Sequence, residues 1–108
     1  MNEPADAASP PQQRPPPAGA IVRVLPIVNS KGLHARAAAQ FVLTVEKFAA
    51  AVTVTRGHET VGGTSIMGLL MLSAGPGTSI TVTAAGAQAA QVMAALEALV
   101  AGRFGEDE

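Results

Sequence analysis

Residues 35–56, ARAAAQFVLTVEKFAAAVTVTR, change from a helical to an extended pattern within one short stretch. Apolar side chains first recur every three or four residues, which predicts an amphipathic helix over 35–47. Over 51–56, valine alternates with threonine, which is typical of a strand with one buried face. A helix that leads directly into such a strand favours a layer of helices packed on one face of a sheet.

The segments on either side of this stretch continue the alternation of strands and helices. Upstream, residues 21–28 are rich in β-branched side chains, and Pro26 indicates a strand end or a sheet edge. Downstream, the patterns predict a strand over 59–62, a helix over 64–72, a strand over 78–84 and a helix over 87–101. The order β-α-β-β-α-β-α predicts an α/β fold, a two-layer sandwich whose antiparallel sheet is covered on its apolar face by three helices.

The two ends of the chain differ in composition from this central part. Residues 1–20 hold six of the eight prolines and, apart from Met1, no large apolar side chain, which predicts a disordered Pro-rich tail. Residues 21–104 form the predicted domain, and residues 105–108 form an acidic C-terminal end. Within the domain, six basic side chains outnumber three acidic ones, which suits acidic or phosphorylated partners.

The composition argues against several classes of function. Without cysteine the chain has no disulfide, thiolate nucleophile or cysteine-ligated zinc, and His34 and His58 are too far apart in sequence to suggest a metal site. Three aromatic side chains and a net charge of −1 argue against nucleic-acid binding. No run approaches the roughly 18 apolar residues of a membrane span, and the N-terminus lacks the pattern of a secretory signal. We therefore expect a cytoplasmic protein.

The motif Gly32-Leu33-His34-Ala35-Arg36 places a histidine directly before the helix predicted from residue 35. Unpaired backbone N–H groups at the start of a helix favour an anion there, and the Arg36 guanidinium has donors that match a phosphate. A neutral imidazole is a nucleophile. His34 is therefore a candidate acceptor of a phosphoryl group, with Arg36 beside it, although these residues leave open that His34 only caps the helix.

Hydrolytic chemistry finds little support in the sequence. The acids within the domain are Glu46, Glu59 and Glu97, and each belongs to a different segment. None of them is positioned in the sequence to orient His34, as the acid of a catalytic triad would be. An acid that comes close to His34 only through the fold stays open.

The segment 65–72, SIMGLLML, is the second candidate site. One side of the predicted helix carries Ser65, Gly68, Leu69 and Leu72. The other side, which we call the apolar patch, carries Ile66, Met67, Leu70 and Met71. A short helix on a sheet buries only one side, so two apolar sides predict an exposed docking surface, for which methionine is well suited. Coverage of both sides by neighbouring helices is the alternative.

Ser65 has two compatible roles. Together with Thr64 it supplies the cap of the helix over 64–72. A phosphate on Ser65 would add negative charge at the edge of the apolar patch, where the start of the helix stabilises it. Ser65 is therefore also a candidate regulatory phosphorylation site.

The motif at residues 32–36, followed at the matching distance by Ser65-Ile66-Met67-Gly68, resembles HPr, the histidine phosphocarrier of the phosphoenolpyruvate-dependent phosphotransferase system. The resemblance covers nearly all of residues 21–104. It implies an open-faced sandwich, with four antiparallel strands and three helices on one side. Residues 69–72 (LLML) and 104–108 (FGEDE) look most similar to the nitrogen-related branch of this family.

The resemblance implies a phosphoryl carrier and not an enzyme, without cofactor or metal. His34 would accept a phosphoryl group on Nδ1 from phosphorylated enzyme I and pass it to an enzyme IIA, with Arg36 stabilising the group. Ser65 would match the serine that HPr kinase/phosphorylase modifies, and the apolar patch would dock the partners. In the nitrogen-related branch these are a nitrogen-type enzyme I and a regulatory enzyme IIA, and we expect a monomer.

The sequence departs from the family at Ala37, where most members have proline. Because proline at the first helical position preorganises the backbone, this departure predicts a slightly looser loop. Two other classes of protein stay open as alternatives. One is a non-catalytic binding module that uses the Ile66–Met71 patch alone, and the other is a small hydrolase resembling acylphosphatase.

Overall fold

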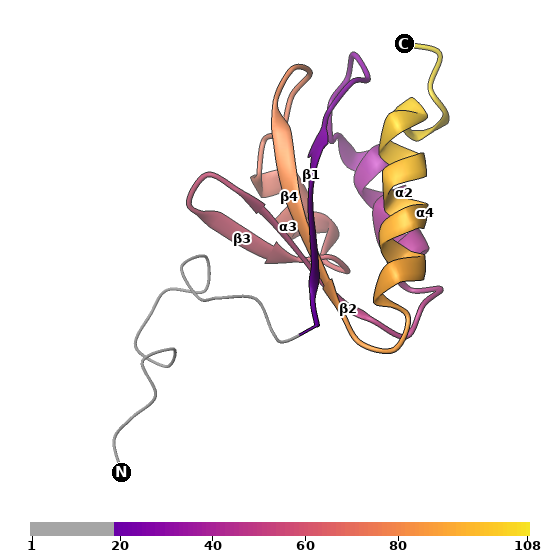
Figure 1. Cartoon of the computed structure of the whole chain (residues 1–108). Helices are drawn as coiled ribbons and strands as arrows, with labels where there is room; N and C mark the ends of the chain where they lie inside the picture. Colours follow the sequence, from indigo (N-terminus) through magenta and orange to yellow (C-terminus); the bar gives the residue numbers. More distant parts are fainter. Residues whose placement is uncertain (1–18) are drawn as a thin grey trace.

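The computed structural model describes residues 19–108, so the predicted Pro-rich tail lies outside these residues except for its last two positions. The elements follow one another in the predicted order (Figure 1). They are β1 (Ile21–Pro26), α2 (Ala35–Val45), β2 (Ala51–Arg56), β3 (Glu59–Gly62), α3 (Ile66–Met71), β4 (Ser79–Ala85), α4 (Ala89–Ala101) and a short 3₁₀ helix, η2 (Arg103–Gly105), which the sequence does not predict.

The four strands form one antiparallel sheet in the order β1-β4-β2-β3. β4 lies in the middle of the sheet, where Ile80 pairs with Leu25 of β1 and Val82 pairs with Val54 of β2. β1 is an edge strand and ends at Pro26, as the missing N–H of proline requires. The two-layer sandwich with an antiparallel sheet is therefore confirmed.

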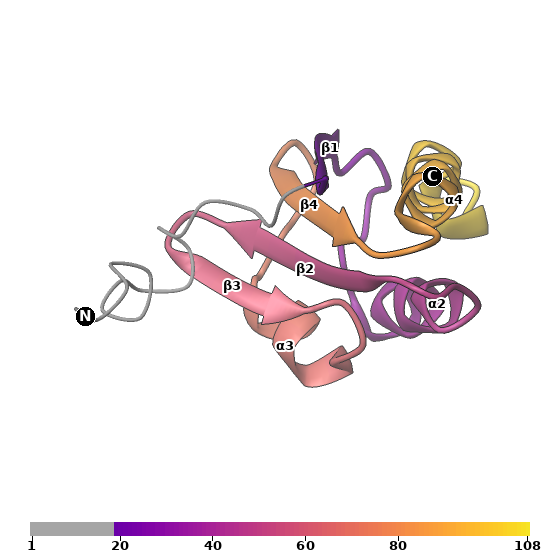
Figure 2. The ribbon, with the colours of Figure 1, turned by 60° about the horizontal axis from the view of Figure 1, so that its bottom comes forward.

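The helices all lie on one face of the sheet, and the other face is open (Figures 1 and 2). α2 packs against both α3 and α4, α4 also contacts β1 and β4, and α3 contacts β3. The alternation in β2 explains which face is covered, because Val52 and Val54 are buried under the helices whereas Thr53 is exposed.

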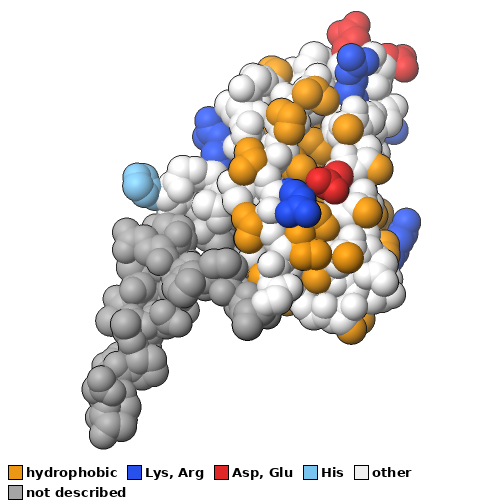
Figure 3. All heavy atoms as spheres, in the orientation of Figure 1, with side chains coloured by type: hydrophobic (Ala, Val, Ile, Leu, Met, Phe, Trp, Pro, Cys, Tyr) orange, Lys and Arg blue, Asp and Glu red, His pale blue; other side chains and the backbone are white. Residues whose placement is uncertain are grey.

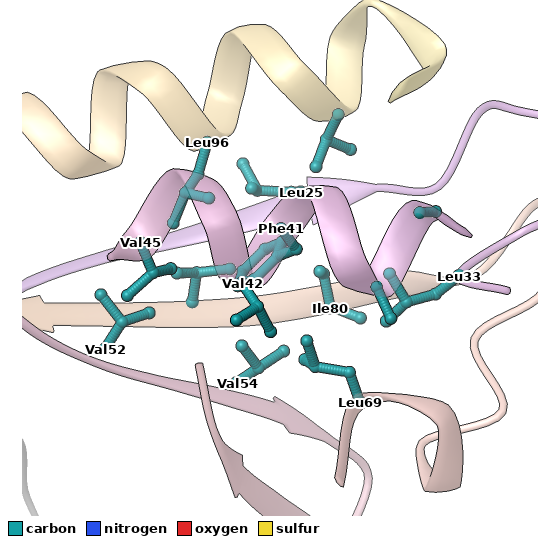
Figure 4. Close-up of a cluster of buried hydrophobic side chains, with 14 of the residues drawn as sticks. Leu25, Leu33, Phe41, Val42, Val45, Val52, Val54, Leu69, Ile80 and Leu96 are labelled. Atoms are coloured by element: carbon teal, nitrogen blue, oxygen red, sulfur yellow. The ribbon is translucent and has the colours of Figure 1, made fainter. Parts of the chain in front are cut away.

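The core between the two layers consists almost entirely of aliphatic side chains (Figure 4). Phe41 of α2 is fully buried, with Val54 and Ile80 of the sheet on one side and Leu96 of α4 on the other. Removing such an aromatic ring from a packed core costs about 3–5 kcal/mol. This packing fixes the position of α2 and therefore of the histidine at its start.

Several element boundaries differ from the sequence prediction by one or two residues, including both ends of α3, which spans Ile66–Met71 where the prediction is 64–72. α2 ends at Val45, two residues before the predicted end, and Glu46 takes the C-cap position. α4 begins at Ala89, two residues later than predicted, because the Gln88 side chain accepts a 2.7 Å hydrogen bond from the Ala49 N–H and so ties the preceding turn to another loop. Shifts of this size are common at helix ends and leave every predicted element in place.

Candidate functional site

His34 is the N-cap residue of α2, with an extended backbone at φ −82° and ψ −178°. Its carbonyl oxygen accepts a hydrogen bond from the Ala38 N–H at 2.8 Å. Its side chain makes no capping hydrogen bond, so the alternative that the imidazole only caps the helix is wrong. The side chain keeps 27% of its surface exposed and is accessible to a partner.

A tight loop holds His34 in place. Gly32 has a φ of +66°, and a Cβ atom on it would lie 2.6 Å from the Ala74 carbonyl oxygen, so the loop requires glycine. Leu33 is buried, and its N–H donates to the same Ala74 oxygen at 2.9 Å. The glycine and leucine of the motif therefore tie His34 to the segment that follows α3.

The last residues of the chain fold back toward this loop. We call residues 103–108 the C-terminal strap. Phe104 anchors the strap in the core at 1% exposure, although Arg103 and Phe104 both have positive φ, at 58° and 53°. That backbone conformation costs about 1–2 kcal/mol for each residue with a side chain. At the other end of the strap, the Ser30 N–H donates to the Glu108 carbonyl oxygen at 3.1 Å.

Glu106 of the strap contacts His34 directly. Its Oε2 meets His34 Nε2, and its Oε1 accepts a 2.9 Å hydrogen bond from Asn29 Nδ2. Asn29 is fully buried, and its Nδ2 also donates to the Gly32 carbonyl oxygen at 2.8 Å. The hydrogen bonds from Asn29 and then from His34 hold the pKa of the Glu106 carboxyl below its ordinary value, although desolvation acts in the opposite direction. Glu106 is therefore ionised at neutral pH.

A polar cavity of about 430 Å³ opens where Glu106 lies. Ser30, Lys31 and Arg36 line one part of it, and residues 105–108 of the strap line the rest. Figure 3 shows acidic side chains gathered at the end of the molecule where Figure 1 places the C-terminus, with basic side chains close by. Lys31 and Arg36 supply positive charge and hydrogen-bond donors that match the oxygens of a phosphoryl group, whereas Glu106, Asp107 and Glu108 add negative charge to the same lining.

Asn29 and Glu106 are the two residues of this site that the sequence prediction misses. The sequence leaves a spatial carboxylate neighbour of His34 open, and the structure identifies it as Glu106 of the C-terminal end, 72 residues away. The sequence predicts for Asn29 only that it belongs to a turn. The three acids at 106–108 were the available signal, but sequence spacing does not show that Phe104 turns the chain back toward His34.

The second candidate segment forms α3. Ser65 is its N-cap, and the exposed Ser65 Oγ accepts a 2.9 Å hydrogen bond from the Gly68 N–H. Three side chains of the apolar patch are exposed, namely Ile66 (41%), Met67 (68%) and Met71 (69%). Leu70, the fourth, is half-buried and packs against the core. The patch thus remains largely open next to α2, the helix that begins at His34.

Ala37 is the third residue of α2 and is fully buried. It therefore lies two residues beyond the first helical position, the position at which proline preorganises the backbone. The N–H groups of the first turn have no acceptor within the helix. The N–H that alanine has and proline lacks therefore adds no hydrogen bond within α2. The Ala38 N–H donates to the His34 carbonyl oxygen at 2.8 Å, so the first hydrogen bond of α2 forms with alanine at position 37, and the looser loop stays a prediction.

Residues 19–108 contain neither a membrane-spanning helix nor a cluster of metal ligands. No helix in this part of the chain is long and apolar enough to span a membrane. No three His, Cys, Asp or Glu side chains within it gather as the ligands of a metal ion would.

Comparison with known proteins gives consistent matches to one family. The family model described as the PTS HPr component phosphorylation site matches residues 21–102. Phosphocarrier protein HPr of Neisseria meningitidis serogroup A is 48% identical over 82 residues, which cover 76% of this chain and 92% of that protein. Phosphocarrier protein NPr of Shewanella violacea is 38% identical over 84 residues, which cover 78% and 92% of the two chains.

Solved structures of the same family share the fold. HPr-C-His from Thermoanaerobacter tengcongensis matches with a TM-score of 0.78 at 34% identity, over 82% of this chain and 99% of that one. HPr from Bacillus anthracis matches with a TM-score of 0.73 at 34% identity, over 76% and 98% of the two chains. The chain therefore belongs to the HPr family of the phosphotransferase system, whose members are phosphocarrier proteins and not catalytic enzymes.

Proposed function

We propose that His34 accepts a phosphoryl group from phosphorylated enzyme I, with phosphoenolpyruvate as the ultimate donor, and passes it to an enzyme IIA. The observation that carries this proposal is the contact of His34 Nε2 with Glu106 beside a cavity lined by Arg36. It leaves Nδ1 as the ring nitrogen without a hydrogen-bond partner among the described residues. Phosphoenolpyruvate is a metabolite of the cytoplasm, so the proposed relay operates there.

The proposed transfer is an exchange of one bond to phosphorus for another. The lone pair of Nδ1 forms a bond to phosphorus while the bond between phosphorus and the donor breaks, and that electron pair stays with the donor. Nε2 keeps its hydrogen, so no proton has to leave the ring in this step. The phosphoryl oxygens would then enter the cavity, where Lys31 and Arg36 supply positive charge and hydrogen-bond donors. Transfer onward is the same exchange with a nucleophile of enzyme IIA.

The apolar patch on α3 is the proposed docking surface for both partners. Met67 and Met71 are more than two-thirds exposed, and Ile66 is exposed beside them. Large apolar side chains that stand together in solvent favour a protein interface. Because α3 packs against α2, a partner that covers the patch also comes within reach of His34.

Ser65 is the proposed regulatory site, as a substrate of HPr kinase/phosphorylase where a cell has one. Its side chain is exposed directly before Ile66 of the apolar patch. A phosphate would bring about −1.5 to −2 charges to the edge of the docking surface. Burying that charge without a partner is costly, so phosphorylation of Ser65 would weaken docking.

A regulatory role in the nitrogen-related branch is the preferred form of this proposal. Residues 69–72 and 104–108 support it by their similarity to that branch, and one relative carries the name NPr. Labelling by a nitrogen-type enzyme I and by a sugar-type enzyme I can be compared directly. Faster labelling by the sugar-type enzyme would contradict the regulatory assignment.

Incubation with phosphoenolpyruvate and enzyme I, followed by mass spectrometry, tests the proposed carrier function. We expect one phosphoryl group on His34 that is lost in mild acid, because a phosphoramidate hydrolyses readily in acid and a phosphoserine does not. His34→Ala should remain unlabelled and melt like the wild type. Undiminished labelling of this variant would overturn the proposal, as would turnover of an acyl phosphate by the wild type, which is the activity of the hydrolase alternative.

A further inference from the structure

We propose that Asn29 and Glu106 form a positioning pair that fixes the hydrogen of the His34 imidazole on Nε2 and thereby keeps the lone pair of Nδ1 free for the phosphoryl group. This inference rests on the proposed function of His34 and adds to it what controls the reactive nitrogen. It is drawn from an unbroken series of hydrogen bonds that runs from the Gly32 carbonyl through Asn29 and Glu106 to His34.

The Gly32 carbonyl stands at one end of this series and determines which group donates in each of its hydrogen bonds. The Gly32 carbonyl oxygen can only accept, so the Asn29 group 2.8 Å from it must be the NH₂ of the amide. The same nitrogen lies 2.9 Å from Glu106 Oε1 and donates its other hydrogen there. An ionised carboxylate has no hydrogen to give, so Glu106 Oε2 must accept from His34 Nε2. In a neutral imidazole, a hydrogen on Nε2 leaves the lone pair on Nδ1.

Burial keeps the pair in this orientation. Asn29 is 0% exposed and both hydrogens of its Nδ2 are used, while its Oδ1 has no hydrogen-bond partner. If the amide rotated by 180°, Oδ1 would face the Gly32 carbonyl oxygen and Glu106 Oε1, and both hydrogen bonds would be lost. The observed orientation is therefore favoured even though Oδ1 is unpaired. The strap is held on both sides of Glu106, by buried Phe104 and by the hydrogen bond from Ser30 to Glu108. The lowered pKa of Glu106 keeps the carboxylate ionised, and therefore able only to accept, at neutral pH.

Glu106→Gln gives the sharpest test, because it reverses the last hydrogen bond without changing the shape of the side chain. Asn29 would still donate to the carbonyl oxygen of the substituted side chain, so the NH₂ of the new amide would face His34 Nε2. Nε2 would then have to accept, and the hydrogen would move to Nδ1. We expect nitrogen-15 NMR at about pH 9, where an ordinary imidazole is neutral, to show hydrogen on Nε2 in the wild type and on Nδ1 in this variant.

The rates of phosphoryl transfer from phosphorylated enzyme I should follow the same logic. Glu106→Gln should slow transfer by roughly tenfold or more, since the wrong tautomer removes the nucleophile. Glu106→Ala removes the constraint without imposing the wrong tautomer and should lose less. A merely structural role predicts the opposite order, because glutamine preserves the packing of glutamate and alanine does not. Asp107→Asn, the same change of charge one residue along the strap, should keep the wild-type tautomer.

A double variant separates the pair from any general loosening of the loop. In Asn29→Ala with Glu106→Gln, nothing holds the new amide in the reversed orientation, so it can turn its oxygen toward His34. Transfer should therefore recover relative to Glu106→Gln alone, although two residues of the site have been changed. Thermal melts of each variant show whether it remains folded.

The outcomes distinguish the positioning pair from the carrier function on which it rests. Hydrogen on Nε2 in Glu106→Gln, or transfer as fast as in the wild type, would overturn the positioning pair while leaving the carrier function intact. A wild type that phosphorylated enzyme I does not label would overturn the carrier function, and the NMR measurement would still report the tautomer. Equal losses of transfer rate in Glu106→Gln and Glu106→Ala, with no recovery in the double variant, would also overturn the positioning pair. They would show that Glu106 acts only through its negative charge.

Discussion

In the proposed site Arg36 serves the transferred phosphoryl group and not the fold. Its side chain is exposed and lines the polar cavity beside Lys31. Charge-assisted contacts to a phosphate are worth roughly 1.5–3 kcal/mol, so Arg36→Ala should slow transfer by at least about tenfold. Arg36→Lys should recover only part of this loss, because lysine lacks the planar fork of donors. A wild-type transfer rate in Arg36→Ala, measured with enzyme I, would contradict this role.

Glu106 should make the stability of the protein depend on pH in a defined window. Hydrogen bonds from Asn29 and His34 lower its pKa in the folded state, so the stability they contribute is fully present above the ordinary carboxyl value of 4.5. It is lost as the pH falls through the lower folded-state value. Thermal melts of the wild type and Glu106→Gln between about pH 7 and about pH 3 should therefore converge on acidification. Melting curves that stay parallel over this range would show that Glu106 does not contribute in this way.

Local sequence singles out His34 and Arg36 as candidates, because both lie at the start of one predicted helix. It was not enough for Asn29 and Glu106. Their contact joins positions 77 residues apart and arises from the path of the chain after Gly102. Hydrophobic periodicity carries no information about such a path, since Arg103 and Phe104 adopt positive φ without the glycine that usually marks it.

At the scale of the elements, α3 has a capped N-terminus and an exposed apolar side. Substitutions can test the contribution of each feature on its own. Ser65→Asp keeps an oxygen that can cap the helix, so the melting temperature should hardly change, whereas labelling of His34 by enzyme I should slow. Met67→Glu places charge on the patch without touching the cap and should have the same effect. Labelling of both variants at the wild-type rate would exclude the patch as the docking face. Unfolding of both would show instead that the patch belongs to the core.

The loop before α2 makes a second prediction at this scale, with a matched control in the β2–β3 hairpin. Gly32 and Gly57 both have positive φ, at 66° and 62°, but only a Cβ on Gly32 would meet a neighbour, the Ala74 carbonyl oxygen at 2.6 Å. Gly57→Ala should cost about 1–2 kcal/mol of stability from backbone strain alone. Gly32→Ala should cost more and should also slow transfer, because the loop must move His34. Equal stability losses in urea unfolding, with normal transfer in both, would refute this.

For the whole molecule, the sequence predicted the layers but not the arrangement of strands within the sheet. Alternating valine and threonine reports which face of a strand is buried, and helical spacing reports which side of a helix faces the core. Neither reports that β4 inserts between β1 and β2, a pairing that brings Ile21 opposite Ala84. That pairing joins β1 to the rest of the sheet and, together with Phe104 in the core, lets the end of the chain meet the loop that carries the histidine.

The central claim is that the fold presents Nδ1 of His34 as the nitrogen that carries the phosphoryl group. Nitrogen-15 and phosphorus-31 NMR of the protein, labelled on its histidines and phosphorylated with phosphoenolpyruvate and enzyme I, identifies the bonded nitrogen directly. We predict coupling of phosphorus to Nδ1 of His34, with hydrogen retained on Nε2 opposite Glu106. Coupling to Nε2, or a phosphoryl group on any other residue, would contradict the claim.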